Sequence, residues 1–440
     1  MRLTRTLLRA VSSSSTAAPS SSSSSMLFLS EQNVQKVLTM KDCLQVNRQA
    51  FQALANGTAR VPTRLGLPYG NNGDWTLFKP ASLTDTTNDD DDTPDKKDMM
   101  GIKVVSVRAQ NPSNGKPLVP ATILSIDPAS GMVQGVIAGT FLTAARTATG
   151  SALSTLLCQQ SSHKHIQRVT IFGAGLQARM HVYALSTALA TQQDLLSESQ
   201  RQYYQQQQQT PEEQQSSPSP SNSNNNNKDQ QIPIPHLTII NRTPANAQAL
   251  KDALEQDASA TWAHQIDIID LSDSLAVAAA VADSQVIYTT TNTPTPLFDS
   301  HSLVTPGTHV ASVGSYTPDM QELPARLVDH CRVFMDTPEA MQVGDLRHLA
   351  TTPQHPVTLL GWALLQHSKQ QQQQEPQSNT TDNHDPQASW WEDDQWVDPQ
   401  VHYCTFFKSV GTAIQDVTTA NLVVDKARQL GIGTEIVMNE

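Results

Sequence analysis

The chain has 440 residues, of which 38% are hydrophobic and 16% charged, so it can bury a sizeable core. Its formal net charge of −12 argues against a nucleic-acid partner and against binding to an acidic membrane surface. No uninterrupted apolar run reaches the roughly 18 to 20 residues that a membrane-spanning helix needs.

The first 25 residues differ in composition from the rest of the chain. They contain Arg2, Arg5 and Arg9, many serines and no acidic residue. Arginines at helical spacing among leucines are typical of a mitochondrial transit peptide, and a plain disordered tail is the alternative. The sequence therefore predicts the mitochondrial matrix as the location, with the cytoplasm as the alternative.

Residues 26–141 predict a smaller α+β unit. Apolar residues at helical spacing predict two amphipathic helices within 31–56, and an extended segment with prolines at its edges follows. Residues 70–98 are predicted to be loop, including the acidic run at 89–92. Three strands joined by hairpins are then expected, which implies a largely antiparallel sheet; they are predicted at 101–107, 120–127 and 131–139.

Residues 142–366 alternate between helix and strand patterns, which predicts a parallel, doubly wound α/β sheet. Two polar segments interrupt the chain, at 191–232 and at 367–404. The first is rich in Gln, Ser, Pro and Asn and cannot bury enough apolar surface to order itself, so we expect a disordered insertion.

The four cysteines lie far apart and show no Cys-x-x-Cys spacing. We interpret Cys43, Cys158, Cys331 and Cys404 as reduced, buried thiols and not as a disulfide framework or a zinc site. No metal site is predicted from the sequence.

The segment VTIFGAGLQA carries the clearest chemical signal. Gly173-x-Gly175-x-x-Ala178 sits between a strand and a helix at the start of the alternating series. The first glycine permits a tight turn, the second lets the backbone approach a pyrophosphate, and Ala178 lets the helix pack closely. The helix N-terminus at Leu176 and Gln177 then offers free N–H groups to the phosphates of a dinucleotide.

The end of the second strand discriminates between cofactors. An NAD site usually has an acidic residue there for the ribose 2′-hydroxyl. This chain offers Asn241, Arg242 and Thr243 instead, and an arginine with small hydrogen-bonding neighbours suits a 2′-phosphate. We therefore prefer NADP(H), with NAD(H) as the alternative.

Several segments together resemble the ornithine cyclodeaminase/mu-crystallin family. They include VPTRLGLP, GIKVVSV, the ARTA segment, GAGLQA, ASVGSYTPDMQEL and TFFKSVGTAIQD, in the family's order. The resemblance implies a dinucleotide-binding Rossmann domain at 142–366 beside a smaller dimer-forming domain. That smaller domain would be discontinuous and built from 26–141 and 405–440.

The resemblance also implies roles for individual residues. Lys103 corresponds to the active-site lysine, and a partly buried lysine can act as a proton donor. Arg64 and Arg146 correspond to the arginines that bind the substrate carboxylate. Further cofactor contacts are implied at four positions, which are Asn246, Thr290, Val313 and Lys408.

One departure from the family bears on the reaction. Ornithine cyclodeaminases carry an aspartate where this chain has Tyr316, and Asp319 lies three residues further on. We therefore favour reduction of a small cyclic ketimine carboxylate, with Tyr316 beside the substrate and a homodimer as the assembly. The alternatives are an ornithine cyclodeaminase, an amino-acid dehydrogenase, and a ligand-binding protein of mu-crystallin type without turnover.

Overall fold

The computed structural model describes residues 25–70, 74–84, 98–159, 166–194, 232–351, 356–373 and 404–437. Residues 1–24 of the tail predicted at 1–25 lie outside the described residues, and Ser25 begins strand β1. Most of both predicted insertions, at 195–231 and 374–403, also lies outside the described residues. Helix α9 (Leu360–Gln373) includes residues 367–373, which corrects the predicted start of the second polar segment.

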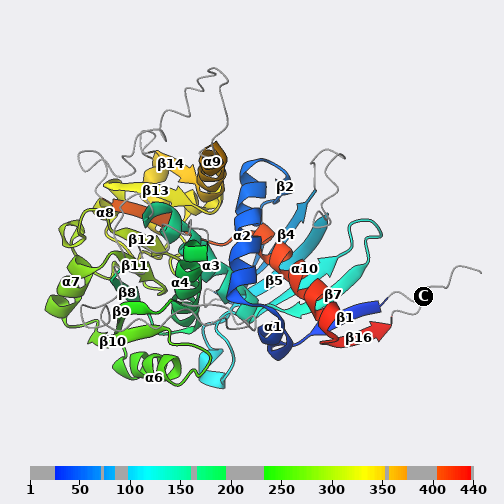
Figure 1. The fold of residues 1–440 in the computed structure, drawn as a ribbon, viewed down its shortest axis with the longest axis horizontal. Helices are drawn as coiled ribbons and strands as arrows, with labels where there is room; N and C mark the ends of the chain where they lie inside the picture. Colours follow the sequence, from blue (N-terminus) through cyan, green and yellow to red (C-terminus); the bar gives the residue numbers. More distant parts are fainter. Residues whose placement is uncertain are drawn as a thin grey trace, which may run out of the picture.

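Within the described residues, eight parallel strands form the larger sheet, in the order β10-β9-β8-β11-β12-β15-β13-β14 (Figure 1). Helices pack against it, as the doubly wound α/β class requires, and that prediction is confirmed. The strands are β8 (Arg168–Phe172), β9 (Ile234–Asn241), β10 (Ala263–Asp270), β11 (Val286–Thr289), β12 (His309–Ser312), β13 (Cys331–Met335), β14 (Val357–Leu359) and β15 (Cys404–Lys408). The helices are α4 (Leu176–Asp194), α6 (Pro244–Glu255), α7 (Ser274–Asp283), α8 (Ala325–Asp329) and α9.

The strand order of this sheet reverses at β8. Strands β9 and β10 lie on one side of β8, and β11, β12 and β15 lie on the other. Phe172 at the end of β8 pairs with Thr289 at the end of β11. The carboxyl ends of the strands at such a reversal form the crevice in which open α/β sheets bind ligands.

The smaller sheet is largely antiparallel, as predicted, and β1 alone pairs in parallel with β7. It runs β16-β1-β7-β6-β5-β4-β2, with β3 paired to β4. Its strands are β1 (Ser25–Leu29), β2 (Ala59–Arg60), β3 (Leu65–Tyr69), β4 (Asp74–Leu83), β5 (Met99–Val107), β6 (Ala121–Ile126), β7 (Val133–Ala138) and β16 (Thr434–Val437). The prediction of a loop over residues 70–98 is wrong for β4, which pairs with β5 from Trp75 to Leu83.

Helices cover one side of the smaller sheet (Figure 1). They are α1 (Glu31–Val37), α2 (Met40–Ala55), α3 (Thr140–Gln159) and α10 (Ala413–Leu430). The two predicted helices at 31–56 are confirmed as α1 and α2, which begin at capping boxes on Ser30 and Thr39. Buried side chains of α2, α3 and α4 share one hydrophobic cluster with β8 and β9, so α2 and α3 also pack toward the larger sheet.

Strand β15 corrects the predicted division of the chain. Residues 404–408 pair in parallel with β12 and β13 and therefore belong to the larger sheet. Helix α10 follows at once and packs against β4, β5 and β6 of the smaller sheet. The turn between them, at Gly411, thus joins the parallel sheet to the antiparallel one.

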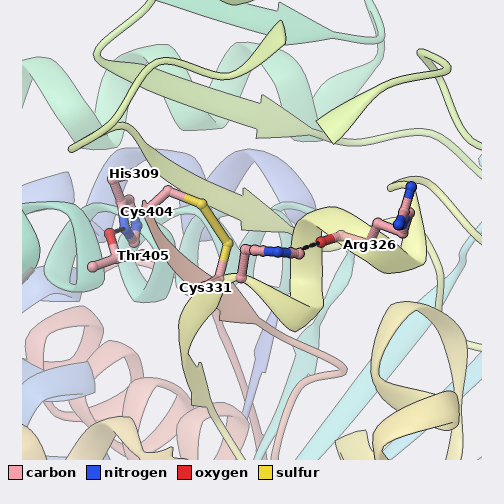
Figure 2. Close-up of a disulfide and its surroundings, with 6 residues drawn as sticks. His309, Arg326, Cys331, Cys404 and Thr405 are labelled. Carbon is pink, nitrogen blue, oxygen red and sulfur yellow. Dashed lines mark hydrogen bonds between the residues drawn. A yellow bond between two sulfur atoms is a disulfide. The ribbon is translucent and has the colours of Figure 1, made fainter. Parts of the chain in front are cut away.

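The predicted thiol state is wrong for two of the cysteines. Cys331 on β13 and Cys404 on β15 form a disulfide, with Cα atoms 4.8 Å apart (Figure 2). The two residues lie directly opposite each other in neighbouring strands, although 73 residues separate them in sequence. Cys43 and Cys158 are free and buried, as predicted.

The described part of the chain holds no helix that is both long and apolar enough to cross a membrane.

Candidate active site at the junction of the two sheets

The glycine turn lies at the reversal of the parallel sheet. Gly173 has φ of +110°, and a Cβ there would collide with the Thr290 hydroxyl. Thr290 donates from its backbone N–H and its hydroxyl to the carbonyl of Phe172, at 2.9 and 2.8 Å, and so fixes the turn. Both positions were predicted to contact a cofactor.

The start of α4 is open above this turn. A Cβ at Gly175 would meet no atom within 4 Å, Leu176 is 43% exposed, and Ala178 is fully buried against the sheet. The side-chain oxygen of Gln177 is buried and has no hydrogen-bond partner among the described residues. The open N-terminus of α4, whose first N–H groups have no partner within the helix, fits the pyrophosphate of a dinucleotide, so the residues present suit the predicted cofactor.

The residues after β9 form an exposed turn. The Asn241 amide donates to the carbonyl of Thr243 at 2.9 Å, and Arg242, Thr243 and Asn246 are exposed. Arg242 has no hydrogen-bond or ion-pair partner among the described residues. Its guanidinium is therefore available to an anion at the carboxyl end of β9.

A buried polar cluster supports the loop after β12, where Val313 is half-buried. Glu322 accepts hydrogen bonds from the backbone N–H groups of Gly314 and Ser315, at 2.7 and 3.1 Å, and from that of Thr291 at 2.6 Å. One carboxylate thus ties the loops that follow β11 and β12 together. Glu322 was not predicted, and its sequence context gives no signal of this role.

Lys408 belongs to the same cluster. Its ammonium is fully buried, donates to Ser312 at 3.0 Å and to Ser315 at 2.5 Å, and pairs with Asp345 at 3.3 Å. No exposed atom of the ammonium remains, so its position does not support the predicted cofactor contact. The structure gives Lys408 a supporting position beneath the loop after β12.

A second buried cluster joins the smaller sheet to α3 and α10. Lys103 on β5 contacts both carboxylate oxygens of Asp416, each at 2.7 Å, and Arg146 on α3 donates from Nε to Asp416 at 2.9 Å. All three side chains are at most 4% exposed. The two predicted cationic residues therefore meet on one carboxylate, which the sequence analysis missed.

Burial and neighbouring charges shift the pKa values of Lys103 and Asp416 in this cluster. Burial lowers the pKa of Lys103 well below its usual value and the neighbouring Arg146 lowers it further, while Asp416 opposes both. Burial opposes ionisation of Asp416, but Arg146, Lys103 and Lys79 together hold its pKa below the usual value. Asp416 therefore stays anionic, and Lys103 holds its proton less tightly than an exposed lysine does.

A pocket opens beside this cluster. Arg64 lines it and has no hydrogen-bond or ion-pair partner among the described residues. Gly411 also lines it, and a Cβ at that glycine would collide with the guanidinium of Arg146, which therefore lies directly behind the wall. The remaining lining residues are Val61, Pro62, Lys79, Thr337, Glu339, Thr412 and Ala413.

Tyr316 and Asp319 do not line this pocket. Tyr316 is half-buried, and burial raises the pKa of its phenol. Asp319 is exposed, so its position gives no sign that it replaces the aspartate of the cyclodeaminases. The pocket instead brings together Arg64 and, behind its wall, Arg146, which is a pair of cations suited to a carboxylate.

The chain matches the family model described as "Ornithine cyclodeaminase/mu-crystallin family" over residues 24–198 and 228–431. It is 25% identical to an uncharacterized cyclodeaminase of Dictyostelium discoideum, over 94% of this chain and 100% of that protein. It is 22% identical to a Delta(1)-pyrroline-2-carboxylate reductase of Bacillus cereus, over 93% of this chain and 99% of that protein.

A solved structure has the same fold. The Delta(1)-pyrroline-2-carboxylate reductase of Thermococcus litoralis, in complex with NADH and L-proline, superposes with a TM-score of 0.65 at 22% identity. The match covers 93% of this chain and 100% of that one. Since the family model spans nearly all of the chain outside the N-terminal tail and the first insertion, the chain belongs to the ornithine cyclodeaminase/mu-crystallin family.

Proposed function

We propose that this protein reduces a small cyclic ketimine carboxylate to a cyclic amino acid, with NADPH as the reductant. The observation that carries the proposal is the buried Lys103–Asp416–Arg146 cluster behind a pocket that Arg64 lines. Relatives of this chain that are named pyrroline-2-carboxylate reductases support the same reaction class. When bound, the nicotinamide supplies the hydride that the C=N carbon accepts.

The chain's own residues bind the substrate and deliver a proton. Arg64 contacts the carboxylate from the pocket, and Arg146 attracts it from behind Gly411. Lys103 gives a proton from Nζ to the ring nitrogen, which makes the neighbouring carbon electrophilic. Asp416 holds the Lys103 side chain in place, and its negative charge favours the protonated form of Lys103.

The cofactor preference follows from the turn after β9. Arg242 is exposed and unpartnered among the described residues, and Asn241 occupies the position at the strand end where NAD sites usually carry an acid. A 2′-phosphate would gain a charge-assisted bond there. We therefore propose NADPH as the preferred reductant and NADH as a poorer one.

We further propose a homodimer through the smaller sheet. Helix α10 covers the face of that sheet that carries Lys103, and the alternate residues of its strands face away. Phe28 and Met100 on that other face are 45% and 37% exposed, and Leu65 and Tyr69 on β3 are 61% and 67% exposed. An apolar surface of this kind is typical of a protein–protein interface, and a second copy of the chain would cover it.

An absorbance assay tests the reaction. The full-length protein is mixed with Δ1-piperideine-2-carboxylate or Δ1-pyrroline-2-carboxylate, with NADPH and separately with NADH, beside a Lys103→Ala variant. We expect NADPH oxidation by the wild type and a loss of about 10²-fold or more in the variant. Tight ligand binding without turnover would instead identify a binding protein, and proline formed from ornithine would identify a cyclodeaminase.

A further inference from the structure

Lys79 occupies a position that the proposed reaction does not use. It lies on β4 directly opposite Lys103 on β5, so both lysines point to the side of the sheet that α10 covers. Two ammonium groups at directly opposed positions repel each other, which costs stability unless nearby anions compensate them. Lys79 is 6% exposed and lines the pocket, whereas Lys103 lies behind it.

The two lysines differ in what they bind. The Lys103 ammonium contacts both oxygens of Asp416 and approaches the hydroxyl of Thr143 at 3.5 Å. Lys79 donates one hydrogen bond, to the carbonyl of Gly411 at 2.6 Å. Among the described residues no carboxylate lies within ion-pair distance of Lys79, so two of its three N–H groups have no acceptor.

The nearby acids make their hydrogen bonds to other groups, and the second oxygen of Asp336 is buried without a partner among the described residues. Asp416 binds Lys103 and Arg146, and one oxygen of Asp336 accepts from the Ser409 hydroxyl and from the backbone N–H groups of Val410 and Gly411. Glu339 lines the pocket and accepts from the Thr337 hydroxyl. Arg64 and Lys79 are therefore two pocket-lining cations without an acidic partner among the described residues.

A buried ammonium that lacks an anion carries a free-energy penalty that a bound anion relieves. The pKa of Lys79 is lowered to about 8, chiefly by burial; Arg146 and Arg64 also lower it, and Asp416 and Asp336 oppose them. In the proposed reaction Arg64 and Arg146 take up the carboxylate next to the C=N bond. Lys79 is then the cation that remains for another group of the substrate.

We propose that Lys79 binds a second carboxylate, so that the preferred substrates are cyclic imine dicarboxylates and not monocarboxylates. This inference rests on the proposed function, since it assigns the first carboxylate to the arginines. A charge-assisted hydrogen bond in a buried site contributes enough to favour the dicarboxylate by about 10- to 100-fold in kcat/KM. Lys79 is thus a specificity-determining residue in the pocket wall, where it contacts the carbonyl of Gly411.

A matched pair of substrates isolates the second carboxylate. Δ1-Piperideine-2-carboxylate and Δ1-piperideine-2,6-dicarboxylate share the ring and the C=N bond and differ by that one group. With NADPH, we expect the wild type to show a dicarboxylate-to-monocarboxylate ratio of kcat/KM of about 10 or more. In Lys79→Met this ratio falls to about 1, and Lys79→Arg keeps most of the preference because it keeps the charge.

Lys251→Met is the matched control, because Lys251 also donates to a backbone carbonyl, that of Ile266 at 2.8 Å, but lies on α6 outside the pocket. Its ratio should equal that of the wild type. A wild-type ratio near 1, or an unchanged ratio in Lys79→Met, would overturn the inference. Equal losses for both substrates in Lys79→Met would also overturn it and would make Lys79 a proton donor or a structural residue.

A binding measurement keeps the inference separate from the proposed reaction. If the wild type turns over neither imine, the proposed function fails, and calorimetry then compares piperidine-2-carboxylate with piperidine-2,6-dicarboxylate on the NADPH-loaded protein. Tighter binding of the dicarboxylate by the wild type, lost in Lys79→Met, would support the second carboxylate site. Equal affinities would refute it.

Discussion

Replacing Asp416 by asparagine should be among the most damaging single changes in the candidate site. The substitution keeps the shape of the side chain and removes the charge that Lys103 and Arg146 share, at 2.7 and 2.9 Å in a fully buried position. Removing one partner of a buried ion pair costs about 3–5 kcal/mol, because the other charge is left without compensation. We therefore expect the free energy of unfolding to fall by that amount.

Urea denaturation followed by circular dichroism measures this loss. The dependence of the unfolding free energy on urea concentration should be the same in the variant and the wild type. Lys426→Gln is the control on the same helix, because Lys426 pairs with Asp42 at a site where both side chains are partly exposed. A surface pair of that kind contributes at most about 1 kcal/mol. A loss below about 1 kcal/mol in Asp416→Asn would refute the reasoning.

A double variant separates lost attraction from uncompensated charge. Asp416→Asn combined with Lys103→Met removes both the carboxylate and one of the ammonium groups that depend on it. If the cost comes from an uncompensated ammonium, the double variant should be less destabilised than the sum of the two single variants. Additive losses would contradict this explanation. Asp416→Asn and the double variant should both lack the proposed reductase activity.

Three further outcomes follow from the structure. Gly173→Ala should raise the Kd for NADPH about 10-fold or more, measured by fluorescence titration, because φ of +110° and the adjacent Thr290 hydroxyl exclude a Cβ; an unchanged Kd would contradict the predicted turn. Arg242→Ser should raise the KM for NADPH but not for NADH, and equal effects on both would remove the argument for a 2′-phosphate site. Burial lowers the pKa of His181 from 6.5 to about 4, so between pH 6.5 and about pH 4 His181 is protonated in the unfolded chain and neutral in the folded chain. Stability should therefore fall by about 2 kcal/mol from this group between about pH 7 and pH 5, and the fall in urea midpoint should be smaller in His181→Gln.

Local patterns predicted the parts of the fold that depend on neighbouring residues. The glycine turn at Gly173 is encoded by a strand, two glycines and a helix start that follow one another directly in the chain, and the structure has that order. The alternation of strands and helices likewise predicted the parallel sheet. Strand β4 was missed because it lies beside a run of aspartates, and its stability comes from pairing with β5, which a local pattern does not reveal.

Contacts between distant residues account for what the sequence did not predict. Asp416 sits inside a helix and resembles any helical acid until α10 places it between Lys103 and Arg146, which lie 313 and 270 residues away in sequence. The disulfide depends on β13 and β15 becoming neighbours in the sheet. Lys79 gave no signal of its own, because its significance comes from its register with Lys103 and from the pocket.

In the proposed reaction, hydride reaches the C=N carbon of a cyclic imine carboxylate held at this site. The most direct test supplies the wild-type protein with NADPH deuterated at the nicotinamide C4 and with Δ1-piperideine-2-carboxylate. Mass spectrometry and NMR then locate the label in the product. We predict piperidine-2-carboxylate with one deuterium at C2, and no labelled product from Lys103→Ala above about 1% of the wild-type rate. Product without deuterium at C2, or oxidation of NADPH without any cyclic amino acid, would contradict the account.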